Sequence, residues 1–174
     1  MGPKPLDCSV LNEGLLREVR EQWIAEVEKI RGDTEDFRAI YLEHAEILIK
    51  NPEGNSQIFG LFDENKVCKA IFHAHAKPIK GHPGVTMRVP WIQQSPNFDL
   101  GQWNHTELAD FSAGLMVSAI ELSLNELKAD RIKMHLSNVV DREFVSAWAF
   151  VYNGKQKDFT VEIVGGWLHI EYVN

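Results

Sequence analysis

The chain has few cysteines and no long apolar run. Its 174 residues include only Cys8 and Cys68, too few for a disulfide framework or a cysteine-based metal site. No apolar stretch approaches the ~20 residues that are needed to cross a bilayer. Residues 1–10 carry Pro3 and Pro5 but no basic segment followed by an apolar one, so we expect no cleaved leader. A cytoplasmic protein without membrane attachment is the interpretation that fits these absences.

Positive charge is also in short supply. Lys and Arg number 18 against 25 Asp and Glu, which gives a formal net charge of −7. A protein that binds nucleic acid through its phosphates needs a basic face, so we predict no nucleic-acid partner, although a local basic pocket stays open. Without repeats or low-complexity tracts, the length predicts one domain over residues 1–174, with residues 1–6 disordered.

Two helices are predicted in the N-terminal third. Apolar residues recur at helical spacing in both, and polar residues that favour helix ends flank them. The two helices are therefore expected to pack as a pair. The expected caps and stops are Asn12 and Gly32 for the first helix, and Asp33 or Thr34 and Asn51-Pro52 for the second.

A meander of three strands is predicted next. Residues 57–62 and 67–76 flank the turn-forming Asp63-Glu64-Asn65, which is typical of a hairpin. A third strand is predicted over 85–92. Pro90 inside it has no N–H to donate, so it marks a sheet edge, a bulge or a local break.

The C-terminal half has the most informative pattern, which reads strand, helix, strand, helix, strand, strand. A strand joined through a long helix to the next strand is a right-handed parallel crossover, and a closing hairpin across Gly165-Gly166 makes the sheet mixed. The polar stretch 93–106 is long enough to be a functional or mobile loop. The predicted strands are 85–92, 131–136, 158–164 and 167–173, and the predicted helices are 110–129 and 141–152.

This order of elements resembles the GNAT superfamily of acyl-CoA N-acyltransferases over roughly residues 7–174. The most specific part is 132–152, where a strand ends in Leu136-Ser137-Asn138 and a helix carries Tyr152, as in the strand-loop-helix segment of the family. The resemblance implies an α+β fold. Its sheet would be mixed, with an antiparallel meander, a parallel crossover and a C-terminal hairpin, and helices would flank it.

The resemblance also implies an activity. Acetyl-CoA or another acyl-CoA, or a carrier thioester, would be the co-substrate, and a small-molecule or peptide amine would be the acceptor. In the family a bulged strand binds the acyl arm, a helix N-terminus behind a Gly-rich loop binds the pyrophosphate, and a Tyr protonates the leaving thiolate. Carried over to this chain, the cofactor-binding positions are Val89, Pro90, Trp91, Ser112, Ala113, Gly114 and Asn138, and the acid is Tyr152.

The pyrophosphate loop departs from the family pattern Arg/Gln-x-x-Gly-x-Gly/Ala. If its last position is Ala113 or Gly114, Phe111 or Ser112 replaces the expected Gly. Acidic residues nearby, Glu107 among them, would repel a pyrophosphate. A catalytically inactive GNAT-like module for binding or protein interaction is therefore the alternative, and a homodimer stays open.

Two histidines on one face of a predicted strand, His73 and His75, are candidates for a general base or for metal ligands. Spacing shows no third ligand, so we predict no metal site; only His82, His105 and His135 are available. A polar strand face is the plainer interpretation of the pair. Tyr152, by the same reasoning, can be the acid or simply pack at the edge of the core.

Two further groups of side chains are ambiguous. Glu162 and His169 on the closing hairpin either line a substrate groove or face solvent on an alternating strand. Three aromatic residues near the polar stretch either form an apolar pocket or anchor that stretch. They are Trp91, Phe98 and Trp103.

Overall fold

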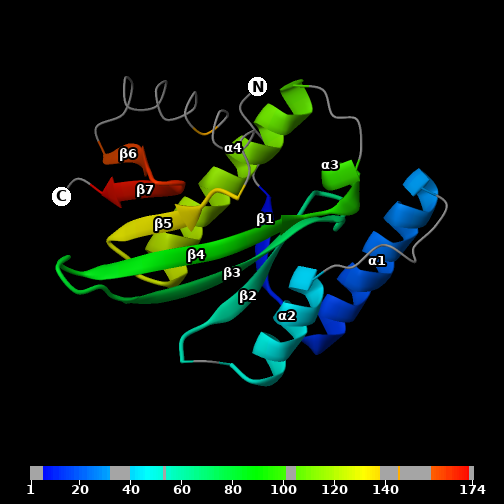
Figure 1. The fold of residues 1–174 in the computed structure, drawn as a ribbon, viewed down its shortest axis with the longest axis horizontal. Coiled ribbons are helices and arrows are strands. Elements are labelled where there is room, and N and C mark those ends of the chain that lie inside the picture. The colour runs from blue at the N-terminus through cyan, green and yellow to red at the C-terminus, as the bar shows by residue number, and fades with distance from the viewer. Residues whose placement is uncertain are drawn as a thin grey trace.

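The computed structural model describes residues 6–31, 40–52, 54–100, 105–137, 145 and 158–172. Its described strands form one seven-stranded sheet in the order β1-β2-β3-β4-β5-β7-β6, flanked by helices (Figure 1). Among them only β4 and β5 pair in parallel. This is the predicted mixed α+β sheet. The strands are β1 (Asp7–Val10), β2 (Gln57–Phe62), β3 (Cys68–Pro78), β4 (Val85–Gln94), β5 (Arg131–His135), β6 (Phe159–Val164) and β7 (Trp167–Tyr172).

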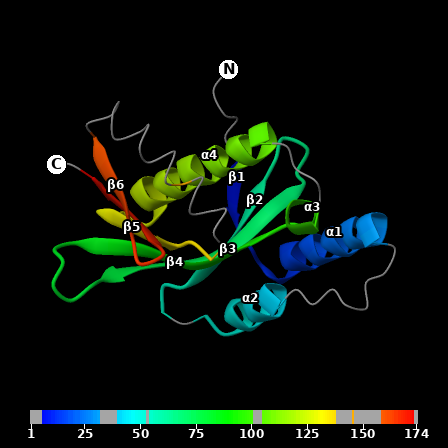
Figure 2. The same ribbon diagram turned by 45° about the horizontal axis from the view of Figure 1, so that its top comes forward.

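Helices cover the two faces of the sheet unequally (Figure 2). Helix α4 (His105–Glu121) lies along one face, whereas α1 (Glu13–Arg31) and α2 (Ile40–Lys50) lie on the other face over its N-terminal strands. Each side has its own buried cluster. The larger cluster lies under α4, and the smaller one surrounds Trp23 of α1, which is fully buried.

The predicted helix pair is present. Helix α1 begins directly after Asn12, whose Oδ1 accepts the backbone N–H of Leu15 at 2.9 Å, which is the geometry of an N-cap. Arg20 of α1 donates to Glu46 of α2 at 2.8 Å and links the two helices. The expected ends at Gly32, Asp33 and Thr34 lie outside the described residues.

The sequence did not predict β1, which pairs antiparallel with β2 at the edge of the sheet. A strand of four residues is too short to show a clear alternation. Directly before it, the backbone carbonyl of Leu6 accepts a hydrogen bond from Ser118 Oγ of α4 at 3.0 Å. The N-terminal strand is thereby tied to the central helix.

The prediction for the segment before α4 was wrong in part. Strand β4 runs on to Gln94, and a short helix, α3 (Pro96–Leu100), follows it, so less of 93–106 is irregular than expected. Helix α4 begins at His105 rather than residue 110 because its first turn is polar, and apolar periodicity cannot reveal it. It ends at Glu121 and continues as a π-helical turn, η1 (Leu122–Glu126).

Of the helix predicted over 141–152, only Val145 is described; it is buried in the cluster under α4. None of the described helices combines the length and the apolar character that a membrane-spanning segment requires.

Candidate functional site

The parallel strands β4 and β5 part at one end of the sheet. Their pairing ends at Val89 and Met134, after which β4 continues beside β3 alone as far as Gln94. At the opposite end they are held together, because Asp130 Oδ2 accepts the N–H of Val85 at 2.6 Å and the Asp130 N–H donates to the Val85 carbonyl at 2.8 Å. The pair is therefore closed at one end and open at the other.

A β-bulge lies where the strands part. The register between β3 and β4 shifts by one residue between His73 and His75. As a result two residues of β4, Val89 and Pro90, stand opposite Ala74 alone. The bulge interpretation of Pro90 is confirmed, and Pro90 also lies just beyond the last residue of β4 that pairs with β5. Proline fits there because a bulged residue leaves the ladder, where an N–H would be needed.

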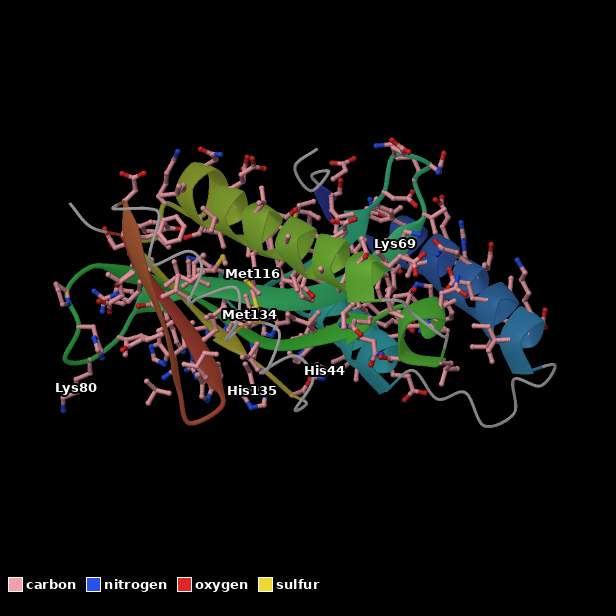
Figure 3. The ribbon with its side chains drawn as sticks, turned by 90° about the horizontal axis from the view of Figure 1, so that it is seen from above. His44, Lys69, Lys80, Met116, Met134 and His135 are labelled. Carbon is pink, nitrogen blue, oxygen red and sulfur yellow. The ribbon has the colours of Figure 1, made fainter. Side chains whose placement is uncertain are left out.

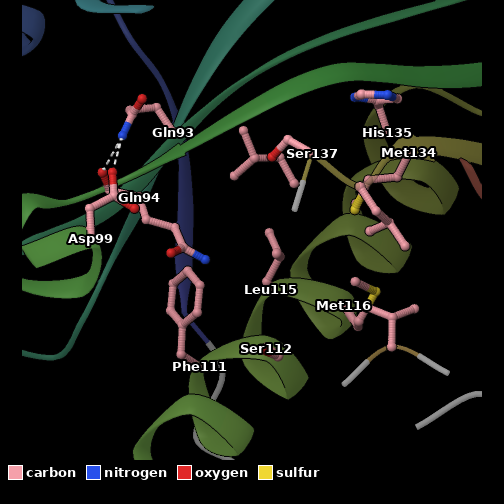
Figure 4. A pocket seen from close by; sticks show the side chains of 13 residues that line it. Gln93, Gln94, Asp99, Phe111, Ser112, Leu115, Met116, Met134, His135 and Ser137 are labelled. Atoms are coloured by element: carbon pink, nitrogen blue, oxygen red, sulfur yellow. Dashed lines mark hydrogen bonds between the residues drawn. The ribbon is translucent and has the colours of Figure 1, made fainter. Parts of the chain in front are cut away.

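A cavity of about 160 Å³ occupies the opening between the two strands (Figure 4). Phe111 and Leu115 of α4 and Met134 of β5 give it an apolar wall, which suits an acyl chain or a thioester arm. The polar side chains around it are Gln93, Gln94, Asp99, Ser112, His135 and Ser137.

Asp99 of α3 is an acidic group at the cavity that the sequence did not single out. Its Oδ2 accepts a hydrogen bond from Gln93 Nε2 at 2.5 Å. Burial raises the pKa of this carboxyl above its usual value, and the Gln93 hydrogen bond opposes the rise. Helix α3 is tied to α1, because the N–H of Asn97 donates to Glu26 Oε2 at 3.2 Å. The length of the polar stretch pointed to this segment but not to Asp99.

His135 connects the cavity to the other face of the sheet. It ends β5, lines the cavity, and its ring lies 4.9 Å from that of Trp167 on β7. Figure 3 shows Met134 with Met116 on the α4 side, and His135 with His44 on the other. From the sequence, His135 was named only as a possible metal ligand, because its position at the cavity depends on where β4 and β5 separate.

The structure corrects part of the predicted cofactor site. Ser112, Ala113 and Gly114 are the eighth to tenth residues of α4, which begins at His105. Their placement at the helix N-terminus was wrong, since interior helical N–H groups bond to carbonyls of the preceding turn. Ser112 nevertheless lines the cavity. Asn138 lies outside the described residues.

His73 and His75 lie on the face opposite α4, beside the strand that carries the bulge. The ring centroids of His73 and Trp91 are 6.0 Å apart, those of His44 and Trp91 5.9 Å, and those of the two strand histidines 5.4 Å. Burial, with smaller effects of His75 and His44, lowers the pKa of His73 to about 4. Burial, Lys77 and Arg88 lower the pKa of His75.

Both strand histidines are half-buried and, with lowered pKa values, neutral at pH 7. Tyr152, the predicted acid, lies outside the described residues. No three His, Cys, Asp or Glu side chains converge into a metal-binding cluster within the part of the chain that the structure describes.

The remaining candidates separate into two groups. Glu162 and His169 stand opposite each other on β6 and β7, away from the residues that line the cavity. Phe98 anchors α3 to α4, with its ring 4.2 Å from that of Phe111. Trp91 packs against the cluster around Trp23 instead of lining the cavity. Trp103 lies outside the described residues.

No protein-family model matches the sequence, and no curated protein matches it significantly. Solved structures are similar. The spermidine N-acetyltransferase from Vibrio cholerae in complex with CoA and spermine has a TM-score of 0.53 at 16% identity, covering 97% of this chain and 94% of that one. A possible acetyltransferase from Clostridium difficile has a TM-score of 0.50 at 6% identity, covering 92% and 99%. The chain therefore has the GNAT-type acyl-CoA N-acyltransferase fold that its element order resembles.

Proposed function

On this GNAT-type fold, we propose that the protein transfers an acyl group from an acyl-CoA, or from a carrier thioester, to an amine. The reaction would take place at the opening between β4 and β5. One observation carries the proposal: the only parallel pair among the described strands separates directly at the bulge of Val89 and Pro90, and a cavity with an apolar wall fills the gap.

The open stretch of β4 would hold the thioester. Beyond Val89 no described strand pairs with β4 on the β5 side. Backbone groups on that side need a hydrogen-bond partner, and the carbonyl and amides of a thioester arm can supply one. Leu115 and Met134 would then contact the acyl chain and exclude water from the reacting carbonyl.

The reaction forms a bond between the amine nitrogen and the acyl carbon and breaks the carbon–sulfur bond. The amine loses one proton and the sulfur gains one. His75 is the better proton acceptor of the two strand histidines, because a pKa of about 4 makes His73 a weak base near neutral pH. Tyr152 is the proposed donor to the sulfur, since its ordinary pKa near 10 keeps it protonated.

A second candidate function is a binding module that does not use acyl-CoA. The first turn of α4 carries Glu107, and a carboxylate at a helix N-terminus competes with an anionic pyrophosphate. The backbone N–H groups of Ser112 to Gly114 do not offset this repulsion by binding the pyrophosphate, since these residues lie inside the helix. This candidate keeps the cavity as a ligand site and predicts no heat of binding with any acyl-CoA.

Calorimetric titration with acetyl-CoA and longer acyl-CoAs separates the two candidates. We expect saturable binding, and a Ser112→Phe variant should weaken it at least tenfold by filling the cavity. Val117→Phe is the matched control, because Val117 is on the same helix, partly exposed and outside the cavity lining. No binding of any acyl-CoA to the unmodified chain would contradict the acyltransferase proposal and favour the binding module.

Mass spectrometry of an amine mixture incubated with the bound acyl-CoA then tests transfer itself. The acylated amine should accumulate in proportion to released thiol. Tyr152→Phe should slow this turnover without weakening acyl-CoA binding, and undiminished turnover would remove Tyr152 from the mechanism.

A further inference from the structure

The sheet face opposite α4 carries a row of basic side chains beyond the part that α1 and α2 cover. The strand register places His75 of β3 opposite Arg88 of β4, Arg88 opposite Lys133 of β5, and Lys133 opposite His169 of β7. Opposite partners in a ladder point to the same face. The chain as a whole has a net charge of −7, so this row of basic residues differs in charge from the protein as a whole.

One aromatic ring contacts both strong cations of the row. The guanidinium carbon of Arg88 is 5.3 Å from the ring centre of Trp167, and Lys133 Nζ is 5.1 Å from it. Stacking on a shared ring holds both cations on this face. We call this set the cationic face; it comprises His73, His75, Arg88, Lys133, His135 and Trp167.

Among the described residues, the cations of the cationic face have no carboxylate paired with them. Two carboxylates share this face but stand opposite other basic residues: Glu162 is opposite His169, and Glu171 is opposite Arg131, at 3.9 Å. No ion pair joins Arg88 or Lys133 to a described carboxylate.

Buried nitrogens on the cationic face have no hydrogen-bond partner among the described residues. They are Arg88 Nε, His73 Nε2 and both ring nitrogens of His75. Buried polar atoms are rarely left unpaired. Arg88 Nε is a donor and each neutral imidazole offers one N–H, and such donors beside two cations suit an anion.

The cationic face meets the cavity at His135, which lines the cavity and contacts Trp167. We propose that Arg88 and Lys133 bind a carboxylate or phosphate group of the acceptor, so that the acceptor is an anionic amine and not a polyamine. This inference rests on the proposed acyl transfer for the role of the ligand as acceptor. A cation such as spermine, which the Vibrio cholerae neighbour holds, would be repelled here.

Matched amines that differ in charge test the inference by calorimetry on the full chain. The pairs are O-phosphoethanolamine with ethanolamine and phenylalanine with phenylalaninamide, and spermine is the polycation. We expect the member of each pair that carries the carboxylate or phosphate to bind at least tenfold more tightly, and the preference should shrink as salt is added. Equal affinities within the pairs, or tighter binding of spermine, would overturn the proposal.

Three variants locate the site. Lys133→Met and Arg88→Gln each remove one charge and should cost at least tenfold in affinity for the anionic amine. Lys80→Met removes the same charge from the exposed turn between β3 and β4, where Figure 3 shows it well apart from His135, and should change affinity less than twofold. Equal losses of affinity in all three variants would mean that the ligand responds to the overall charge of the protein and not to Arg88 and Lys133, and would overturn the proposed site.

Acyl-CoA titration of the same samples keeps the two proposals apart. If acyl-CoA binds and the anionic amines show no preference, the acyl-transfer proposal stands and the anion site fails. If the anionic amines bind and acyl-CoA does not, the anion site stands and the role of its ligand as an acyl acceptor fails. Circular dichroism of each variant checks that the fold is intact.

Discussion

The two faces of the sheet are built from the same strands and differ in chemistry along β4 and β5. On the α4 side Met87, Ile132 and Met134 are at most 1% exposed. On the other side the alternate residues of β4 and β5 are Arg88, Lys133 and His135, half-buried and polar. Alternation along a strand therefore separates two tasks: one set of residues provides the packing free energy, and the other is available for ligands.

The polarity of the face opposite α4 changes along the sheet. Under α1 it is apolar, with Ile71 and Cys68 fully buried beside Trp23. Toward β5 and β7, where no described helix covers it, it becomes basic. The part of this face that the helices cover is therefore buried in the core, and the uncovered part is free to contact a ligand.

The largest expected effect contrasts neighbours on β5. Ile132→Ala should lower the free energy of unfolding by about 2–5 kcal/mol, since it removes fully buried methylenes and leaves a cavity. Lys133→Ala, one residue on and facing the other way, should cost about 1 kcal/mol or less. Urea denaturation of both variants measures the difference, and equal losses would mean that the two faces are not distinct.

A smaller loss of stability is expected from the N-cap of α1, the helix that covers part of the face opposite α4. Asn12→Ala should cost about 1 kcal/mol, because the Leu15 N–H loses its acceptor at the start of α1. Asn12→Ser keeps an oxygen at the cap and is the control, expected to stay within a few tenths of a kcal/mol of the unmodified chain. Denaturation midpoints that rank Ser below Ala would contradict the cap.

An effect at least as large as that of the cap is expected from acid, because each unit of pKa shift corresponds to about 1.4 kcal/mol. The pKa of His73 is about 4 in the folded chain against about 6.5 when unfolded, so the unfolded state binds more protons between these values. Stability should therefore fall as pH drops from 6.5 toward 4. His73→Asn should flatten that part of the curve, and the exposed His82→Asn should not. An unchanged slope in His73→Asn would show that the histidine is not desolvated.

The smallest effect belongs to the surface contact between α1 and α2. Glu46 accepts hydrogen bonds from Arg20 and Lys50, which lower its pKa, but the group is exposed and screened by solvent. Glu46→Gln should leave the urea midpoint unchanged within error. A clear loss would mean that ion pairs, rather than the cluster around Trp23, hold these helices on the sheet.

Local signals in the sequence predicted local features well. The cap at Asn12 follows from the chemistry of a single residue, and so does the irregularity at Pro90, for which a bulge was one of three interpretations; the structure has both. The alternation of β3 also placed His73 and His75 on one face of the strand, as they are in the structure. The GNAT-type order of elements was readable because each element carries its own periodicity.

The sequence could not show which distant residues converge. Asp99 and His135 meet at one cavity only because β4 and β5 part where they do. Arg88 and Lys133 are far apart in the chain, and their shared ring belongs to a third strand. The start of α4 was missed for a different reason, since a polar first turn carries no apolar period.

The bulge at Val89 and Pro90 also sets the phase of β4. Arg88 and Trp91 are three positions apart, an odd spacing that would put them on opposite faces of a regular strand. The extra residue restores them to one face, opposite His75 and His73 respectively. One inserted residue thus lets a single strand present a cation before the opening and an aromatic ring after it on the same side. Removing that residue would turn every side chain beyond it to the opposite face of the sheet. The faces on which the side chains of β4 lie beyond Val89 therefore depend on the bulge.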